Sequence, residues 1–399
     1  MSKLNELIQT LCPNGVPFVE LGTIAKGEKE RNKGEHCNLA YSITKGGLVK
    51  TSDYFKEATV TSEDTSGYKI VRKNWFVYSP SRIDVGSINY LREEEMVIVS
   101  PLNVVFSISE DKILPQYLLY FLQSRFGTWQ ILTKREGIEG TGRKLLPFER
   151  FATIIVPLPP LEIQREVIKI LDVFQNLASE LTAELTARKK QYELYRNSLL
   201  NENKKTPLVT LKEVVKRSCS GATPAKGNPE YYDGGTIPWL RTQDVRFNEI
   251  YKIDSFITEE AVKKTTAKWI PPNCVIVAIS GASAGRCAIN KIATTTNQHC
   301  LNMEIDPEKA LYKYVFYCIC DRYEDLLSRK QGARGDLNST LILSISIPLP
   351  SLEEQIRIVS LLDQFDALCN DLPAEIEARQ KQYEYYRDKL LTFKEVSQC

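Results

Sequence analysis

The chain has 399 residues, of which 43% are hydrophobic and 26% charged, and its formal net charge is +2. This length predicts two or three domains, and the composition is typical of an ordinary globular protein. No run of 18 apolar residues predicts a transmembrane helix, and the near-neutral charge is weak for a protein that binds nucleic acid alone. The N-terminus lacks an apolar signal core and the ten cysteines lack C-x-x-C pairs, so we expect reduced thiols in a cytoplasmic protein.

The first 156 residues predict a short helix followed by a mixed α/β body. The helix carries Leu4, Ile8 and Leu11 and stops at the Cys-Pro-Asn-Gly sequence at 12–15. A short strand begins near Val16. Further strands are predicted by the apolar runs at 75–78, 96–99 and 103–107, and a helix by residues 116 to about 132.

The stretch from Pro157 to Leu200 predicts a long helix behind a proline-rich start. Pro157-Leu-Pro-Pro cannot lie inside a helix, because proline lacks the N–H and clashes with the preceding turn. From Val167 to Leu199 the apolar residues recur mostly at spacings of three, four and seven. About 40 helical residues correspond to a rod of roughly 60 Å, whose apolar stripe needs a partner surface.

A second copy of this stretch supplies that partner. Pro348–Leu391 aligns with Pro157–Leu200 without a gap at an offset of 191 (348 minus 157), and about half of the paired positions are identical. Packing the two copies together as an antiparallel coiled coil buries both stripes. We expect a kink or break at Pro373.

The duplication extends over the whole chain, because the segment that begins at Val16 matches the one at Thr206-Pro-Leu-Val, at an offset of 190 for Pro17 and Pro207. The polar segment 201–207 is the predicted linker. The second body predicts strands at 236–240, 274–279 and 287–290 and a helix from 312 to about 327. We therefore predict an α+β fold with two mixed α/β bodies, two long antiparallel helices and a pseudo-twofold internal duplication.

Catalytic motifs are poorly supported. Gly281–Arg286 is one residue short of a phosphate-binding loop, and its G-x-S-x-G spacing is followed by a predicted strand, where a nucleophile elbow needs a helix. A glycine-rich turn is the favoured interpretation. Only His36 and His299 are present, and His299-Cys300 is interpreted as a packed core pair before a metal-ligand pair. We expect no catalytic residue, metal or cofactor.

Several motifs resemble the target recognition domains of type I restriction–modification specificity subunits. In the second half they are Thr206-Pro-Leu-Val, Ile237–Asp244, Thr296-Asn-Gln298 and the exit Ile347–Gln355. In the first half they are Phe76–Arg82, Gly86–Ile88 and Ser100-Pro101. The twice-used Pro-Leu-Pro-x-Leu-Glu-x-Gln exit is the most specific part of the resemblance.

The resemblance implies two target recognition domains, at 1–156 with the N-terminal helix and at 203–347, and two spacer helices, at 157–202 and at 348–399 with the C-terminal tail. It implies a non-catalytic subunit that reads a bipartite site in double-stranded DNA, with an unspecified gap set by the helices. Methylation belongs to type I methyltransferase subunits and cleavage to restriction subunits, which dock partly on the helices. Two alternatives stay open: a coiled-coil protein-interaction adaptor without a DNA role, and a fused methyltransferase or nuclease.

Candidate DNA contacts are polar side chains near turns, because Arg, Lys, Asn, Gln, Ser and Thr read base edges and hold phosphates. In the first body they are Tyr78, Ser79, Arg82, Lys134, Arg135, Arg143 and Lys144. In the second body they are Arg241, Thr242, Gln243, Ser283, Arg286, Asn297, Lys330 and Arg334. For Arg241 and Asn297 the alternative to a DNA contact is that their side chains brace the fold.

Candidate partner contacts are aromatic and arginine residues of the long helices, since these types are enriched at interface centres. They are Arg188, Tyr192, Tyr195, Arg196, Arg379, Tyr383, Tyr386 and Arg387. At helical spacing, packing in the coiled coil or at a helix end is the favoured interpretation of the tyrosines, and docking is the alternative.

Overall fold

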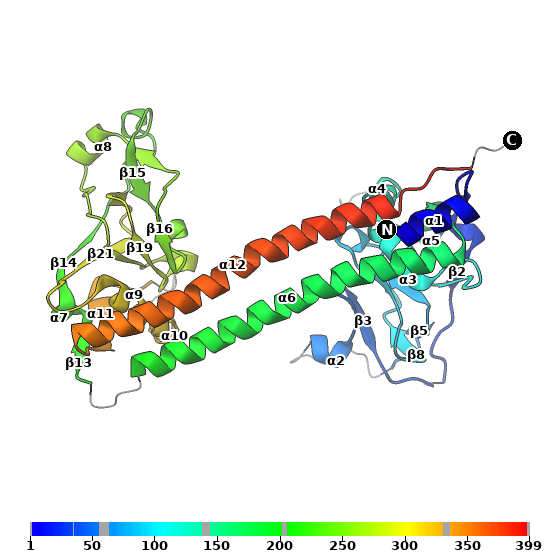
Figure 1. Cartoon of the computed structure of the whole chain (residues 1–399), viewed down its shortest axis with the longest axis horizontal. Helices are drawn as coiled ribbons and strands as arrows, with labels where there is room; N and C mark the ends of the chain where they lie inside the picture. Colours follow the sequence, from blue (N-terminus) through cyan, green and yellow to red (C-terminus); the bar gives the residue numbers. More distant parts are fainter. Residues whose placement is uncertain are drawn as a thin grey trace. The chain divides into compact units, whose positions relative to one another are not determined.

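The computed structural model describes residues 2–34, 36–55, 64–137, 144–201, 206–329 and 336–396. The chain forms two compact units, one of Met1–Thr182 with Glu375–Cys399 and one of Ala183–Ala374. Each unit therefore contains one mixed α/β body and a segment of both long helices (Figure 1).

The first unit is built around a four-stranded antiparallel sheet in the order β2-β9-β6-β7. The strands of this sheet are β2 (Ala25–Glu28), β9 (Val104–Ile108), β6 (Phe76–Tyr78) and β7 (Ile88–Tyr90). Four two-stranded pairs accompany it: β1 (Phe18–Glu20) with β12 (Ile155–Pro157), β3 (Tyr41–Thr44) with β4 (Gly47–Lys50), β5 (Lys69–Arg72) with β8 (Met96–Val99), and β10 (Glu136–Gly137) with β11 (Lys144–Leu145). The α-helices are α1 (Ser2–Leu11), α2 (Thr51–Tyr54), α3 (Pro115–Gln123), α4 (Arg125–Thr133), α5 (Phe148–Phe151) and the start of α6 (Leu161–Asn201).

The second unit repeats this plan with additions. Its main sheet has the order β14-β21-β18-β19-β16, from β14 (Val215–Ser220), β21 (Cys300–Ile305), β18 (Val275–Ala278), β19 (Cys287–Asn290) and β16 (Asn248–Ile250). A smaller sheet joins β17 (Phe256–Ile257), β15 (Ile237–Leu240) and β20 (Thr295–Thr296), and β13 (Leu208–Thr210) pairs with β22 (Ser346–Pro348). The α-helices are α7 (Leu211–Val214), α8 (Glu259–Lys264), α9 (Tyr312–Asp321), α10 (Tyr323–Ser328), α11 (Ser339–Leu343) and the start of α12 (Leu352–Leu390). The order β14-β21-β18-β19 corresponds to β2-β9-β6-β7, so the predicted duplication of the two bodies is confirmed.

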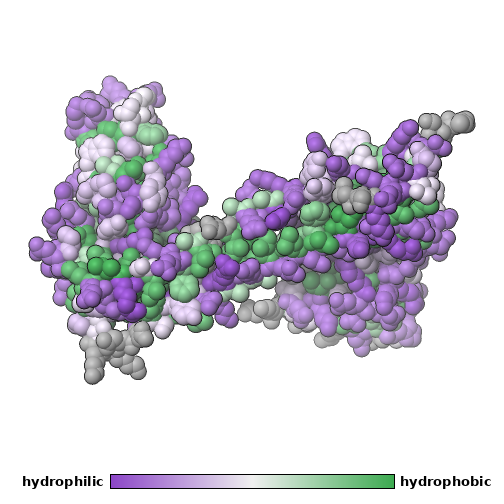
Figure 2. Space-filling model, viewed as in Figure 1, coloured by the Kyte–Doolittle hydropathy of each residue, from purple (hydrophilic) through white to green (hydrophobic). Residues whose placement is uncertain are grey.

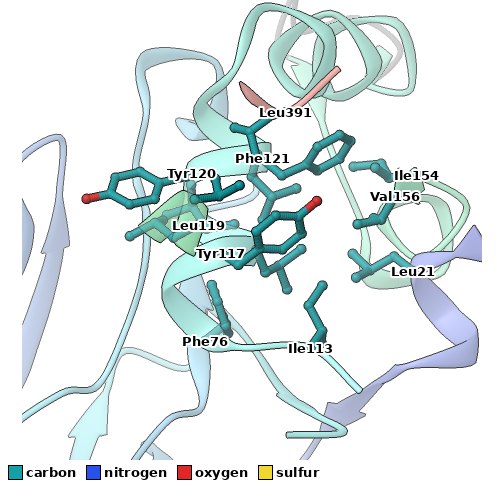
Figure 3. Packing of buried hydrophobic residues seen from close by; sticks show 14 of the residues in the cluster. Leu21, Phe76, Ile113, Tyr117, Leu119, Tyr120, Phe121, Ile154, Val156 and Leu391 are labelled. Atoms are coloured by element: carbon teal, nitrogen blue, oxygen red, sulfur yellow. The ribbon is translucent and has the colours of Figure 1, made fainter. Parts of the chain in front are cut away.

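The core of the first unit lies between the main sheet, α3 and the start of α6. Figure 3 shows Tyr117 and Phe121 of α3 pointing among Leu21, Ile154 and Val156, all of them fully buried. The Tyr117 hydroxyl donates to the Pro157 carbonyl at 3.2 Å, and in the second unit Tyr314 donates to Pro348 at 2.9 Å. A buried hydroxyl needs such a partner, so both tyrosines brace the strand that enters a long helix.

The repeated exit motif is explained by its glutamine, which is fully buried in both copies. Gln164 Oε1 accepts from the Leu114 N–H at 2.8 Å, and its Nε2 donates to the Lys112 and Pro159 carbonyls, each at 2.8 Å. Gln355 makes the same three contacts with Leu311, Lys309 and Pro350, at 2.9, 3.4 and 2.9 Å. One side chain thus ties the start of each long helix to the loop before α3 or α9.

Replacing this glutamine should be costly. We expect Gln164→Ala to lower the unfolding free energy of the first unit by about 3 kcal/mol, because three hydrogen bonds of about 1 kcal/mol each are lost. Urea unfolding followed by hydrogen exchange of peptides from 104–123 measures this loss. Gln380→Ala, an exposed position on α12, is the control. Equal unfolding midpoints in the two variants would contradict the role given to Gln164.

The long helices pack antiparallel within each unit. In the first unit Phe174 of α6 stacks on Tyr386 of α12, with ring centroids 4.9 Å apart. In the second unit Tyr195 of α6 stacks on Phe365 of α12, also at 4.9 Å. The two stacks are equivalent under the internal duplication, because Phe174 corresponds to Phe365 and Tyr195 to Tyr386 at the offset of 191. Figure 2 shows hydrophobic residues along the helix segments of both units.

Two local predictions are corrected. Residues 116–132 and 312–327 each form two helices and not one, because the chain breaks at Ser124 and Arg322. Ser124 has an extended backbone, and its hydroxyl caps α4 by accepting from the Gly127 N–H at 3.1 Å. In contrast, α12 runs through Pro373 without a break.

Candidate nucleic-acid interface

Three loops of the first unit meet at one edge of the main sheet. Tyr78, at the end of β6, pairs with Ile88 and Val104, the first residues of β7 and β9, and Glu28, at the end of β2, pairs with Val105. The strand register therefore places the β6–β7 turn (79–87), the turn before β9 (100–103) and the residues after β2 side by side. Loops at one sheet edge are where a rigid scaffold commonly presents binding residues.

The β10–β11 ribbon is fastened to the same edge by Arg135. Its guanidinium donates to the Asp84 carboxylate at 2.7 Å and to the Ser81 and Lys144 carbonyls at 3.2 and 3.0 Å. The Leu146 N–H adds a bond of 3.1 Å to the Pro80 carbonyl. Because its side chain is only 10% exposed, Arg135 positions the turn and the ribbon and has few donors left for DNA.

The predicted contacts of the first body fall into distinct environments. Arg82 and Lys144 are exposed at this edge, and Ser79 is half-buried beside them. Lys134 is half-buried and donates to the Thr153 hydroxyl at 2.8 Å. Tyr78 is fully buried and donates to the Leu146 carbonyl at 2.9 Å, so its predicted DNA contact is corrected to a role in the core. Arg143 lies outside the described residues.

The second unit presents an equivalent edge. Ala278, at the end of β18, pairs with Cys300 at the start of β21, and Ser220, at the end of β14, pairs with Leu301. The start of β16 runs parallel to the start of β19, with Asn248 opposite Ala288. Segments 221–223, 241–247, 279–286 and 297–299 consequently share one edge. The Leu337 N–H donates to the Ile279 carbonyl at 2.8 Å, as Leu146 does to Pro80 in the first unit.

All described candidates of the second body lie in these segments. Gln243 is exposed, while Thr242, Ser283 and Arg286 are half-buried. Arg241 is half-buried with its guanidinium carbon 5.8 Å from the centroid of the Trp239 ring, and Asn297 is 9% exposed and accepts from the His299 N–H at 3.2 Å. These contacts agree with the bracing alternative for Arg241 and Asn297. Lys330 and Arg334 lie outside the described residues.

Arg246 was missed by sequence reasoning. It is exposed at the same edge, and its Nε donates to the Gln243 carbonyl at 2.7 Å, which holds the guanidinium beside Gln243. The next residue, Phe247, has a φ of 60°, a conformation that non-glycine residues rarely adopt. The available signal was a cation three residues after Gln243.

The other sequence interpretations concern residues 281–300. Residues Gly281–Ser283 form a short turn followed by β19, which confirms the glycine-rich turn. The predicted packed pair at 299–300 is wrong, because Cys300 is fully buried and His299 is exposed. Within the described ranges, no cluster of three or more His, Cys, Asp or Glu side chains could hold a metal ion. A membrane-crossing helix is likewise absent from those ranges.

Comparison with known proteins identifies the family. The sequence model described as the type I restriction modification DNA specificity domain matches residues 16–188 and again 203–379. The chain belongs to this family. It is 36% identical over 313 residues to the type I restriction enzyme EcoR124I/EcoR124II specificity subunit of Escherichia coli, which covers 74% of each chain.

Solved structures show the same fold. A chain from a study of complex assembly and conformational transition of the type I R-M system has a TM-score of 0.62 at 19% identity, covering 95% of this chain and 98% of that one. The type I restriction–modification S subunit from M. genitalium has a TM-score of 0.57 at 14% identity, covering 94% and 96%. These structures confirm the predicted fold class. The family match and the Escherichia coli relative confirm the specificity-subunit assignment and, with it, the non-catalytic role.

The partner-contact candidates of this specificity subunit all make contacts within the chain. Tyr195 and Tyr386 form the helix-pairing stacks described above. The guanidinium carbons of Arg196 and Arg387 lie 5.6 and 5.4 Å from the ring centroids of Tyr192 and Tyr383. Arg188 is ion-paired with Glu184 at 2.5 Å and Arg379 with Glu375 at 3.3 Å. A docking role for these residues remains a prediction.

Buried tyrosines of α3 and α9 also contact the long helices. The hydroxyls of Tyr120 and Tyr317 each donate to an aspartate of a long helix, Asp172 and Asp363, at 2.5 Å. Burial, reinforced by these carboxylates, raises the pKa of both tyrosines well above the usual value. Both hydroxyls therefore stay protonated at neutral pH and act as permanent donors, so these pairs tie the bodies to the helices.

Proposed function

We propose that this specificity subunit recognises a bipartite DNA site, reading one half with the loop edge of each unit. The observation that supports this most directly is the duplication of the edge itself. In each unit the corresponding strands carry their loops at the equivalent edge of that unit's main sheet, yet the side chains in those loops differ between the units. Equal scaffolds with unlike polar residues suit two half-sites of different sequence.

Base reading falls to the exposed and half-buried polar side chains of the two edges. In the first unit these are Ser79, Arg82 and Lys144, and in the second Thr242, Gln243, Arg246, Ser283 and Arg286. Arg and Lys suit guanine, Gln suits adenine, and hydroxyls suit either. With a formal net charge of +2, the subunit leaves part of the phosphate contact to its partners.

The long helices suit the spacing of the half-sites. The 41 residues of α6 correspond to about 60 Å, which exceeds one turn of B-DNA at about 34 Å. We infer that the base pairs between the half-sites are not contacted by either edge.

Chemistry is supplied by other polypeptides. Methyltransferase subunits dock on this chain and modify the site, and restriction subunits join them for cleavage, in the cytoplasm where the genomic DNA lies. The relatives carry the name of specificity subunits, which supports this division of labour and does not favour the adaptor alternative.

Mapping of methylated bases tests the proposal. The chain is expressed with its methyltransferase subunits in a host that lacks other methyltransferases, and the modified positions are sequenced. We expect one motif with two specified parts and an unspecified gap. A continuous motif, or none, would overturn the bipartite reading.

A second-unit substitution should affect one half-site only. We expect Gln243→Ala with Arg246→Ala to weaken discrimination at one half by tenfold or more, since a good base contact contributes about 1–3 kcal/mol. Competition binding with duplexes altered in either half measures this. Lys252→Ala, an exposed residue beyond the opposite end of β16, is the control. Equal loss at both halves would contradict the assignment of one half per unit.

A further inference from the structure

Three cations of the first unit gather at its loop edge and were not among the predicted contacts. Lys29 directly follows β2, and Arg31 forms an antiparallel bridge with Lys69, the first residue of β5. Lys69 pairs with Val99 at the end of β8, and its Nζ donates to the Asn103 carbonyl at 2.6 Å. The group therefore lies against the turn 100–103, next to the β6–β7 turn that carries Arg82.

Three of the four neighbouring carboxylates, Glu28, Glu30 and Glu136, have other partners. Glu30 accepts two bonds from the Arg72 guanidinium, at 2.7 and 3.2 Å, and Glu28 accepts from the Ser107 hydroxyl at 2.8 Å. Lys29 and Lys69 also line a cavity of about 410 Å³ with Glu28, Glu136 and Glu149, of which Glu136 is ion-paired with Arg150. Across the described part of the chain, no ion pair involves Lys29, Arg31 or Lys69.

Like charges held together without carboxylate partners oppose one another. Lys69 is half-buried, and burial together with the charges of Arg31 and Lys29 lowers the pKa of its ammonium group. Arg31 is held in place by its bond from Nη1 to the Gly67 carbonyl at 2.5 Å. An anion bound among the three would relieve this repulsion and complete the site.

We propose that Lys29, Arg31 and Lys69 bind a backbone phosphate of DNA next to the half-site read by the first unit. This rests on the proposed function, because it places the phosphate at the edge that reads bases. Phosphate contacts fix the register of a protein on the duplex without carrying sequence information. In the second unit β14 is followed by Gly221-Ala-Thr223, which puts no cation at the position of Lys29, so we assign this anchor to the first unit.

The salt dependence of binding tests the proposal. Complexes of the methyltransferase subunits with the Lys29→Gln, Arg31→Gln or Lys69→Gln variant are titrated at several salt concentrations. One duplex contains the recognition site found by mapping methylated bases, and a second duplex has an unrelated sequence. We expect each change to weaken binding to both duplexes by a similar factor and to reduce the slope of log K against log salt by up to about 1. Lys73→Gln, at the far end of β5 and paired with Glu95 at 2.9 Å, is the control and should leave the slope unchanged.

Lysine acetylation of the unsubstituted complex gives an independent readout. Lys29 and Lys69 should be protected by the duplex, whereas Lys73 should react equally with and without it. An unchanged salt slope in the three variants, or acetylation of Lys29 and Lys69 that DNA does not affect, would overturn the phosphate site. If the unsubstituted complex bound no DNA at all, the proposed function would fail instead, so the two failures are distinguishable.

Discussion

Replacing Arg196 by glutamate is expected to lower the unfolding free energy of the second unit by about 3–5 kcal/mol, the cost of breaking a buried ion pair. Arg196 Nε lies 3.5 Å from Asp321 Oδ1, and the two side chains are only 19% and 6% exposed. The guanidinium also lies over the Tyr192 ring. A carboxylate at this position would face the carboxylate of Asp321 with little water between them.

Urea unfolding of the full chain, with hydrogen exchange of α9 and α6 peptides as the local readout, measures this loss. Lys189→Glu, an exposed change of equal charge on the same helix, should have little effect. Combining Arg196→Glu with Asp321→Arg should restore part of the stability. If Arg196→Glu had the same unfolding free energy as the unsubstituted chain, the ion pair would contribute nothing to stability.

This expectation changes how docking should be tested. Charge reversal at Arg196 and Arg387 cannot separate partner binding from folding, because both guanidinium groups pack within the chain. Leu194 and Tyr385 are 66% and 60% exposed on the long helices and are better probes of a docking surface. They occupy equivalent positions in the two copies, at the offset of 191.

The second large effect is expected from Gly221→Ala, at the edge of the second unit. A Cβ at this position would lie 1.8 Å from the Thr296 carbonyl oxygen, which also accepts from the Ala222 N–H at 2.9 Å. Because the Cβ is fixed rigidly to the backbone and the oxygen it meets is itself backbone, the end of β14 must move away from segment 296–299. Overpacking of this kind costs about 1–3 kcal/mol or more. We expect loss of discrimination at the half-site of the second unit.

Methylation assays with duplexes altered in one half at a time measure this outcome. Recognition of the other half should persist, because the first unit has its own sheet and core. Gly227→Ala is the matched control, since a Cβ there meets no atom within 4 Å. Full discrimination at both halves in Gly221→Ala would contradict the close approach at this edge.

Pattern and duplication in the sequence predicted much of the fold. Strands at 96–99 and 287–290 and the long helices were predicted because apolar periodicity is a local property that survives in a single sequence. The specificity-subunit assignment came from short motifs that resemble a family, including the exit motif. The glutamine of the exit motif was visible in the sequence as a repeated residue, but the buried hydrogen bonds that it accepts from Leu114 and Leu311 were not.

Contacts between distant residues escaped prediction, because side chains 50 or more positions apart meet only through the register of the sheet. Tyr78 is the last residue of a strand and looked available to DNA, whereas its hydroxyl donates to the Leu146 carbonyl in the core. Arg135 looked like a phosphate contact and proved to be the brace between a turn and a ribbon.

The sequence by itself determined the doubled plan, the class of fold and the family, since repeats, periodicity and motifs are all written along the chain. Only the tertiary structure decided which polar residues share an edge and which are consumed by packing. The physical reason is that burial and charge pairing depend on neighbours brought together by folding. Lys29, Arg31 and Lys69 are three ordinary cations in the sequence and become one site only where β2 ends and β5 begins beside the same turn.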